Sequence, residues 1–164
     1  MTEVGVVLEA APDDLGEWLA DGAAFEAAGA AALWVDLEAD GPLDPLALTA
    51  ALAAVTSRSL LVTTVPATQR EALARTLATV AALSRGRLRI FGAAFSEGET
   101  WDEDARPWLA VPSPENRSAW RATILDAEQR GHSRLMVPCH PRLLDILRNA
   151  DEPDDRRDLH LAMG

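Results

Sequence analysis

Short apolar runs alternate with amphipathic stretches along most of the chain. The nearly continuous apolar runs cover residues 4–9, 31–38, 59–66, 87–91 and 133–138. Runs of this kind are typical of strands that are buried on both faces. Between them, apolar side chains recur every three or four residues, as Leu73, Leu77 and Val80 do, and this spacing predicts helices. The alternation predicts an α/β fold in which helices cover a parallel sheet.

Several helix ends carry their own signals. Helix starts are predicted at Pro12 to Asp14, at Asp44 and Pro45, at a capping box over Thr68 to Glu71, and at Ser113 and Pro114. The predicted helix stops are Gly29, which suits a left-handed turn, and Gly86 and Gly131.

This regular pattern is interrupted once in the middle of the chain and again at its end. Residues 94–112 are acidic and have no clear period, so they are predicted to form an irregular loop with one short strand over 108–111. The tail after residue 150 begins as a charged linker and ends in a short strand or a docked turn over 158–163.

Composition narrows the classes of partner. The chain has 15 arginines, no lysine and 26 acidic residues, which give a net charge of -11. This charge argues against a nucleic-acid partner or an anionic membrane surface. No stretch approaches the about 20 apolar residues of a membrane-spanning helix. Because Cys139 is the sole cysteine and the first residues do not resemble a signal peptide, we expect a cytoplasmic protein.

Four segments together resemble the luciferase-like monooxygenases, which are flavin- or deazaflavin-dependent enzymes built on a (β/α)8 barrel. The similar segments are GAAALWVDLEAD (29–40), DPLALTAALAAVTSRSLLVTTVP (44–66), LARTLATVAALSRGRLRIFGA (73–93) and VPSPENRSAWRATILDAEQRGHSRLMV (111–137). The third is the most specific, because it is similar to the helix-LS.GR-strand signature that precedes the family's fourth loop.

The resemblance implies a shortened barrel. Residues 1–93 resemble the first four βα units and residues 110–149 the last two, whereas a complete barrel takes about 250 residues. We therefore expect a single domain over 1–164, an abridged TIM-barrel-like fold with about six mainly parallel strands wrapped by helices. The loop over 94–112 would replace the family's middle units. Either a smaller barrel closes, or this loop or a second subunit covers the gap.

The resemblance also implies a site at the carboxyl ends of the strands. Asp36 and Glu38 end the second strand, where the family often carries an Asp-His pair beside the flavin. Glu38 stands where the histidine is common, and an acid there can accept a proton if burial raises its pKa. The alternative is a solvated strand end. These two residues are the candidate catalytic groups.

The implied cofactor-binding residues are Thr63, Thr64, Gly92 and Ser113. A threonine at the end of the third strand touches the flavin in the family, but Val62 and Thr64 replace its glycines, which argues against the usual flavin position. Gly92 retains one glycine of the fourth loop. Ser113 matches the phosphate-binding helix start, although Pro112 removes one N–H; the alternative is a plain helix cap.

The remaining candidates are weaker. Arg117 or Arg142 can add positive charge near Ser113, or both are surface arginines. Cys139 and His140 are adjacent, and neighbouring strand residues point to opposite faces, so no metal site is predicted there. Trp101 and Trp108 either pack in the core or line a pocket or an interface.

These observations support a luciferase-like flavin-dependent oxidoreductase that uses FMN or a deazaflavin on a small organic substrate. The alternative is a descendant of that fold that has lost the cofactor and binds a hydrophobic small molecule or a partner subunit. A homodimer, or pairing with a full-length relative, is compatible with either hypothesis.

Overall fold

A computed structural model describes residues 2–8, 13–35, 43–91, 99–101 and 107–150. The strands are β1 (Glu3–Leu8), β2 (Ala32–Val35), β3 (Leu60–Thr64), β4 (Leu88–Phe91), β5 (Glu99–Trp101), β6 (Pro107–Ala110) and β7 (Arg134–Pro138). The helices are α1 (Leu15–Ala27), α2 (Pro45–Val55), α3 (Ala74–Leu83), α4 (Arg117–Gln129) and α5 (Leu143–Arg148), with a 3-10 turn over Ala67–Gln69.

The described strands form one curved sheet in the order β4-β3-β2-β1-β7-β6-β5. Every neighbouring pair from β4 to β6 is parallel, and β5 alone runs antiparallel to its neighbour. The first strand pairs with both β2 and β7, as the first strand of a closed βα barrel pairs with the second and the last. The expected abridged barrel is confirmed, with six parallel strands. Closure of a smaller barrel is not observed, because β4 and β5 stand at opposite ends of the described sheet.

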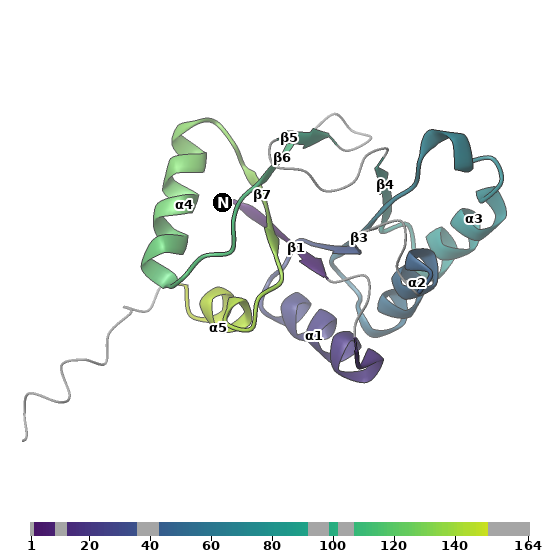
Figure 1. Ribbon diagram of the computed structural model, residues 1–164, viewed down its shortest axis with the longest axis horizontal. Helices are drawn as coiled ribbons and strands as arrows, with labels where there is room; N and C mark the ends of the chain where they lie inside the picture. Colours follow the sequence, from purple (N-terminus) through teal and green to yellow (C-terminus); the bar gives the residue numbers. More distant parts are fainter. Residues whose placement is uncertain (1, 9–12, 36–42, 92–98, 102–106, 151–164) are drawn as a thin grey trace, which may run out of the picture.

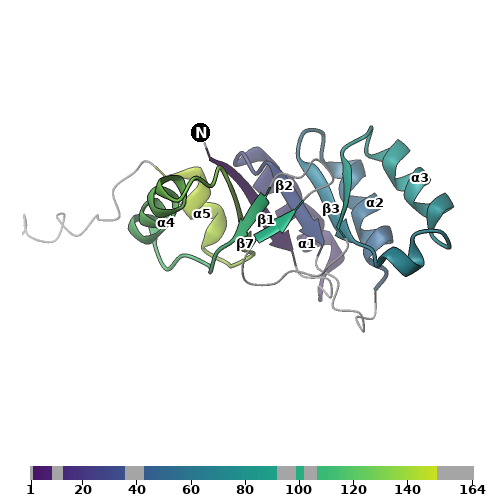
Figure 2. The same cartoon turned by 90° about the horizontal axis from the view of Figure 1, so that it is seen from above.

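The helices cover one face of this sheet, the convex one (Figure 1). Apolar residues of that face, among them Leu33, Leu61 and Leu135, pack against α1, α2, α4 and α5 in a continuous core. A second cluster joins α2 and α3 to β4 through Leu77, Val80 and neighbouring residues. Seen from above, α4 and α5 flank one end of the sheet and α2 and α3 the other (Figure 2). This arrangement is half of a barrel wall.

The helix starts at Asp14 and Asp44 are confirmed. The Asp14 carboxylate accepts hydrogen bonds from the N–H groups of Gly16 and Glu17, and Asp44 caps α2 ahead of Pro45. All three predicted stop glycines have positive φ, 95° at Gly29, 79° at Gly86 and 85° at Gly131.

The predicted capping box at Thr68 is wrong. Residues 67–69 form a 3-10 turn instead, and α3 begins at Ala74 without a side-chain cap. The turn leads into α3 through backbone hydrogen bonds, from the Leu73 N–H to the Gln69 carbonyl and from the Ala74 N–H to the Glu71 carbonyl.

The prediction of an irregular loop over 94–112 is wrong for part of this segment, because it contains the two strands β5 and β6. β5 and β6 pair antiparallel, with Thr100 opposite Trp108, so part of this segment is a hairpin added to the sheet. β6 confirms the short strand predicted over 108–111. It pairs in parallel with β7, which joins this segment to the main sheet. The strand or turn predicted over 158–163 lies outside the described residues. No helix in the described part of the chain is long and apolar enough to span a membrane.

The amino-terminal ends of β3 and β4 are tied together by Glu26 and Arg87. The buried Glu26 carboxylate accepts hydrogen bonds from the N–H groups of Ser57, Arg58 and Ser59, the last at 2.7 Å. The Arg87 guanidinium donates to backbone carbonyls of the same turn, including that of Ser59 at 2.8 Å. One anion and one cation therefore satisfy the backbone of the turn between α2 and β3 from opposite sides.

These contacts set the ionisation of Glu26. Burial by itself raises the pKa of the carboxyl group, but the backbone N–H groups of Ser59, Arg58 and Ser57 outweigh that effect and lower the pKa from 4.5 to about 2. Because the folded pKa is the lower one, the carboxylate stabilises the fold above pH 4.5. This stabilisation is lost as the pH falls through 2.

Replacing Glu26 tests this role. At pH 7 the Glu26→Gln substitution is expected to lower the free energy of unfolding by about 3 kcal/mol, because each pKa unit corresponds to about 1.4 kcal/mol. Urea denaturation at several pH values measures the difference between variant and native chain, which should narrow below pH 4.5. Asp21→Asn, at an exposed position of the same helix, is the matched control. A pH-independent difference would contradict the assignment.

Candidate functional site

The carboxyl ends of β6 and β7 border a cleft at the rim of the sheet. It measures about 720 Å³ and is lined by Ser113, Pro114, Glu115, Asn116, His140, Pro141 and Arg142. These residues come from the segment between β6 and α4 and from the segment between β7 and α5. In βα barrels the loops at this end of the strands hold the ligand, so the cleft lies where a site is expected.

The α4 end of the cleft differs from the prediction. The helix begins at Arg117 rather than at Pro114, and its cap is Asn116, whose side chain accepts a hydrogen bond from the Ala119 N–H at 2.8 Å. The Ser113 hydroxyl donates to the Pro138 carbonyl at 3.1 Å. Ser113 therefore joins the β6–α4 segment to the end of β7, while Asn116 organises the helix start.

Positive charge and one further donor come from the β7–α5 segment. Arg142 is exposed in the cleft, and its backbone N–H donates to Nδ1 of His140 at 3.2 Å. With Nδ1 accepting, the proton of a neutral imidazole is assigned to Nε2, which leaves that nitrogen as a donor. Glu115 adds a negative charge to the same cleft, which opposes the binding of an anion. The charge of Arg142 and the partial positive charge at the amino terminus of α4 favour it.

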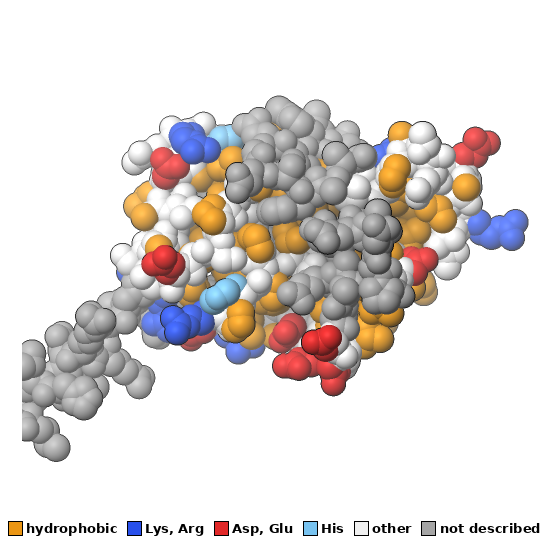
Figure 3. Space-filling view, in the orientation of Figure 1, with side chains coloured by type: hydrophobic (Ala, Val, Ile, Leu, Met, Phe, Trp, Pro, Cys, Tyr) orange, Lys and Arg blue, Asp and Glu red, His pale blue; other side chains and the backbone are white. Residues whose placement is uncertain are grey.

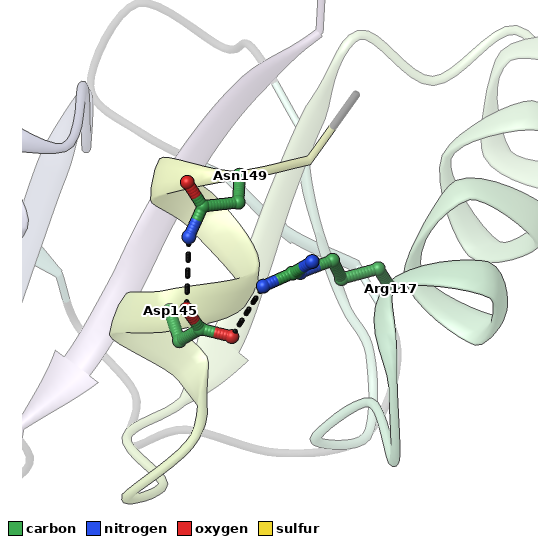
Figure 4. Close-up of polar contacts among 3 residues, drawn as sticks. All are labelled: Arg117, Asp145 and Asn149. Atoms are coloured by element: carbon green, nitrogen blue, oxygen red, sulfur yellow. Dashed lines mark hydrogen bonds and ion pairs between the residues drawn. The ribbon is translucent and has the colours of Figure 1, made fainter. Parts of the chain in front are cut away.

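Arg117 is held away from this role by an ion pair. Its guanidinium contacts the Asp145 carboxylate at 2.8 Å, and the Asn149 side-chain amide donates to the other carboxylate oxygen (Figure 4). The hydrogen bond from Arg117 is the main cause that lowers the pKa of Asp145. The contact ties the first turn of α4 to α5, so Arg142 is the arginine that lines the cleft.

The concave face of the sheet carries an aromatic cluster in place of helices. Trp34 lies 4.5 Å from Phe91 and 6.0 Å from Trp108 between ring centroids, the second pair edge to face. Arg134 lies over the Trp108 ring and also pairs with Glu3 at 2.7 Å. The rings span β4, β2 and β6 and give the interior of the half-barrel an apolar surface.

Gly5 makes room for this cluster. A Cβ atom at Gly5 would lie 2.9 Å from Trp108 and 3.1 Å from Nε1 of Trp34, closer than side chains normally approach. Nε1 of Trp34 is buried and has no hydrogen-bond partner among the described residues. Sequence reasoning missed Gly5, because nothing in the pattern of β1 shows that two indoles cross above it.

The two threonines predicted to bind a cofactor point to opposite faces. Thr64 is in register with Phe91 and follows Val62 on the concave face by the alternation of a strand. Thr63 is in register with Val35, on the helix-covered face, and its buried hydroxyl has no hydrogen-bond partner among the described residues. Of this pair, only Thr64 can face a ligand inside the half-barrel. Asp36, Glu38 and Gly92 lie outside the described residues.

Cys139 and His140 are adjacent in sequence but line different cavities. His140 borders the cleft at α4, whereas Cys139 borders a cavity of about 200 Å³ at the start of α1, with Trp18 and four acidic residues: Asp13, Asp14, Glu17 and Asp21. Acidic side chains gather over α1 in Figure 3. Within the described ranges, no group of three or more His, Cys, Asp or Glu residues is arranged to hold a metal ion.

The comparisons with known proteins give a distant structural likeness and no family. No protein-family model matches the chain, and no curated protein matches it. Among solved structures, the chain is similar to the crystal structure of monooxygenase RslO1 from Streptomyces bottropensis, at 17% identity and a TM-score of 0.42. The match covers 91% of this chain and 65% of that one, so this chain spans less than two thirds of the monooxygenase.

Gly5→Ala tests the packing of the concave face. The added methyl group is expected to displace the rings of Trp34 and Trp108 and to lower the free energy of unfolding by about 1–3 kcal/mol. Chemical denaturation measures the loss, and a shift of tryptophan emission reports the ring movement. Gly16→Ala is the control, since that exposed helix position is far from the rings and a Cβ atom there would meet only the Asp14 carboxylate. Equal stability of the Gly5 variant and the native chain would show that the rings are loosely packed.

Proposed function

We propose that this chain is a flavin-dependent oxidoreductase that binds FMN or a deazaflavin at the carboxyl ends of its parallel strands and acts on a small organic substrate in the cytoplasm. The observation that carries the proposal is the cleft at the start of α4. There a helix amino terminus, the Arg142 guanidinium and the His140 imidazole border one cavity at the rim of a half-barrel.

The described residues fit the phosphate end of such a cofactor. A phosphate is stabilised by the partial positive charge at a helix start and by a guanidinium that can donate two hydrogen bonds. Arg142 would supply the second contribution and Nε2 of His140 a further donor. Ser113, the predicted phosphate ligand, has its hydroxyl committed to the Pro138 carbonyl and would act by holding the segment in place.

The ring end is supported by fewer residues. Thr64 is the polar side chain that faces the concave side at the end of β3, next to Phe91 of β4. A bound flavin would supply reversible hydride or electron transfer. Asp36 and Glu38 are proposed to serve as proton acceptors beside it, and Gly92 to allow a close backbone approach; these roles stay predictions from the resemblance.

A second candidate function follows from the packing of the concave face. Val62 belongs to the closed aromatic cluster, and its side chain occupies a place that the resemblance assigns to glycine. A descendant of the fold without a cofactor would bind a hydrophobic small molecule at the same rim, or a partner subunit such as a second copy or a full-length relative. This alternative needs no phosphate contact at α4.

Titration with FMN and with a deazaflavin separates the two candidates. The flavin-dependent oxidoreductase predicts saturable binding of FMN or the deazaflavin, measured by the quenching of cofactor fluorescence. It also predicts that inorganic phosphate competes with this binding. Binding of neither at tens of micromolar, which corresponds to weaker than about -6 to -7 kcal/mol, would favour the second. Riboflavin, which lacks the phosphate, is the matched ligand control.

Arg142→Ala tests the phosphate contact itself. The loss of a charge-assisted hydrogen bond is expected to weaken FMN binding about tenfold, with little change in riboflavin binding. Arg148→Ala removes an exposed arginine outside the cleft and serves as the control. Asn116→Asp retains the helix cap but adds a negative charge, so it should weaken FMN binding without loss of stability. Unchanged affinity in both cleft variants would place the phosphate elsewhere.

A further inference from the structure

Among the described strands, β4 stands at one end of the sheet, and its outer edge has no neighbouring strand there. The carbonyls of Arg87 and Phe91 accept hydrogen bonds from the N–H groups of Leu61 and Val65 in the β3 segment, at 3.0 and 2.8 Å. Backbone groups alternate in direction along a strand, so the N–H and C=O of Leu88 face away from β3. In a complete barrel the next strand would pair with these groups.

Side chains occupy both backbone groups instead. The Leu88 N–H donates to the Ser84 hydroxyl at 3.2 Å. The Leu88 carbonyl accepts from the Arg89 guanidinium at 2.8 Å, and the same nitrogen donates to the Gly86 carbonyl at 3.0 Å. Ser84 is fully buried and its own hydroxyl donates to the Ala81 carbonyl, so its position is fixed.

We propose that Ser84 and Arg89 block the outer edge of β4 at Leu88, where the strand begins, against strand addition by a second copy of this chain. An edge strand with unpaired N–H and C=O groups is a template for pairing, and proteins block it with charges and local hydrogen bonds. The need is strong here, since shortening the barrel exposes an edge that a complete barrel buries. A second copy is the relevant partner because its β4 carries the same apolar residues, Leu88 and Ile90.

The hydrogen bonds favour this role over an ordinary turn contact. The turn at Gly86 already has backbone bonds, from the Arg85 N–H to the Ala82 carbonyl and from the Gly86 N–H to the Ala81 carbonyl. Arg89 instead donates to two carbonyls, that of Gly86 in the turn and that of Leu88 at the outer edge of β4. Its charge also lies at the edge, where two copies would bring like charges together.

The test is to remove the side chains that occupy the backbone groups of Leu88. Ser84→Ala and Arg89→Ala, made singly and together, are compared with the native chain by light scattering over a concentration series and by hydrogen exchange. Masses are compared with that of one chain, 17.6 kDa. As concentration rises, the mass of the double variant is expected to increase toward twice the mass of the native protein. The peptide containing residues 88–91 should gain protection in step. Arg75→Ala, an exposed arginine of α3, should match the native chain.

Two results would overturn the proposal. One is a double variant with native circular dichroism whose mass and β4 exchange do not depend on concentration. If the double variant does not fold, Arg89→Lys tests the proposal instead. The lysine ammonium group keeps the charge but lacks the guanidinium fork, so a smaller increase of mass with concentration is expected. A lysine variant identical to the native chain in both readouts is the other overturning result.

Discussion

The pairing of β1 with both β2 and β7 is the contact on which the other features depend. It places residues 3–8 beside residues 134–138, across most of the length of the chain, and makes the first strand the centre of the sheet. Because every strand from β4 to β6 then runs in one direction, all of their carboxyl ends meet at one rim. The cleft at α4, the concave aromatic cluster and the open edge at β4 are consequences of this order.

An incomplete barrel has to stabilise surfaces that a complete one would bury. On the convex face the helices do so in the usual way, with Leu33, Leu61 and Leu135 packed beneath them. On the concave face, Trp34, Phe91 and Trp108 pack against one another across the curvature. Gly5 permits that approach, and the Arg134 guanidinium lies over the Trp108 ring. The aromatic rings thus supply the apolar packing on the concave face of the sheet.

The charged residues at the two ends of the strands differ in their role. At the amino ends, the buried Glu26 carboxylate and the partly buried Arg87 guanidinium satisfy the backbone around residues 56–59, an arrangement suited to fixing a turn. At the carboxyl ends, Arg142 and His140 are exposed and border a cavity. Buried charges that meet all of their partners stabilise the fold, whereas exposed donors around a cleft remain available to a ligand. This contrast is what makes the rim the candidate site.

The sequence by itself determined the alternation of strands and helices and the six strands of the parallel sheet, but not β5. Continuous apolar runs such as 59–66 need burial on both faces, and the stop glycines need a left-handed backbone; both constraints are local. It did not locate the start of α4 at Asn116 or the pairing of β5 with β6, since several side chains can cap a helix and short strands are defined by their partners. Only the tertiary structure decided that Thr64 faces inward and Thr63 outward, that Arg117 is committed to Asp145 while Arg142 borders the cleft, and that two indoles meet above Gly5. Those outcomes depend on register and on contacts between residues far apart in the chain, which a local pattern does not encode.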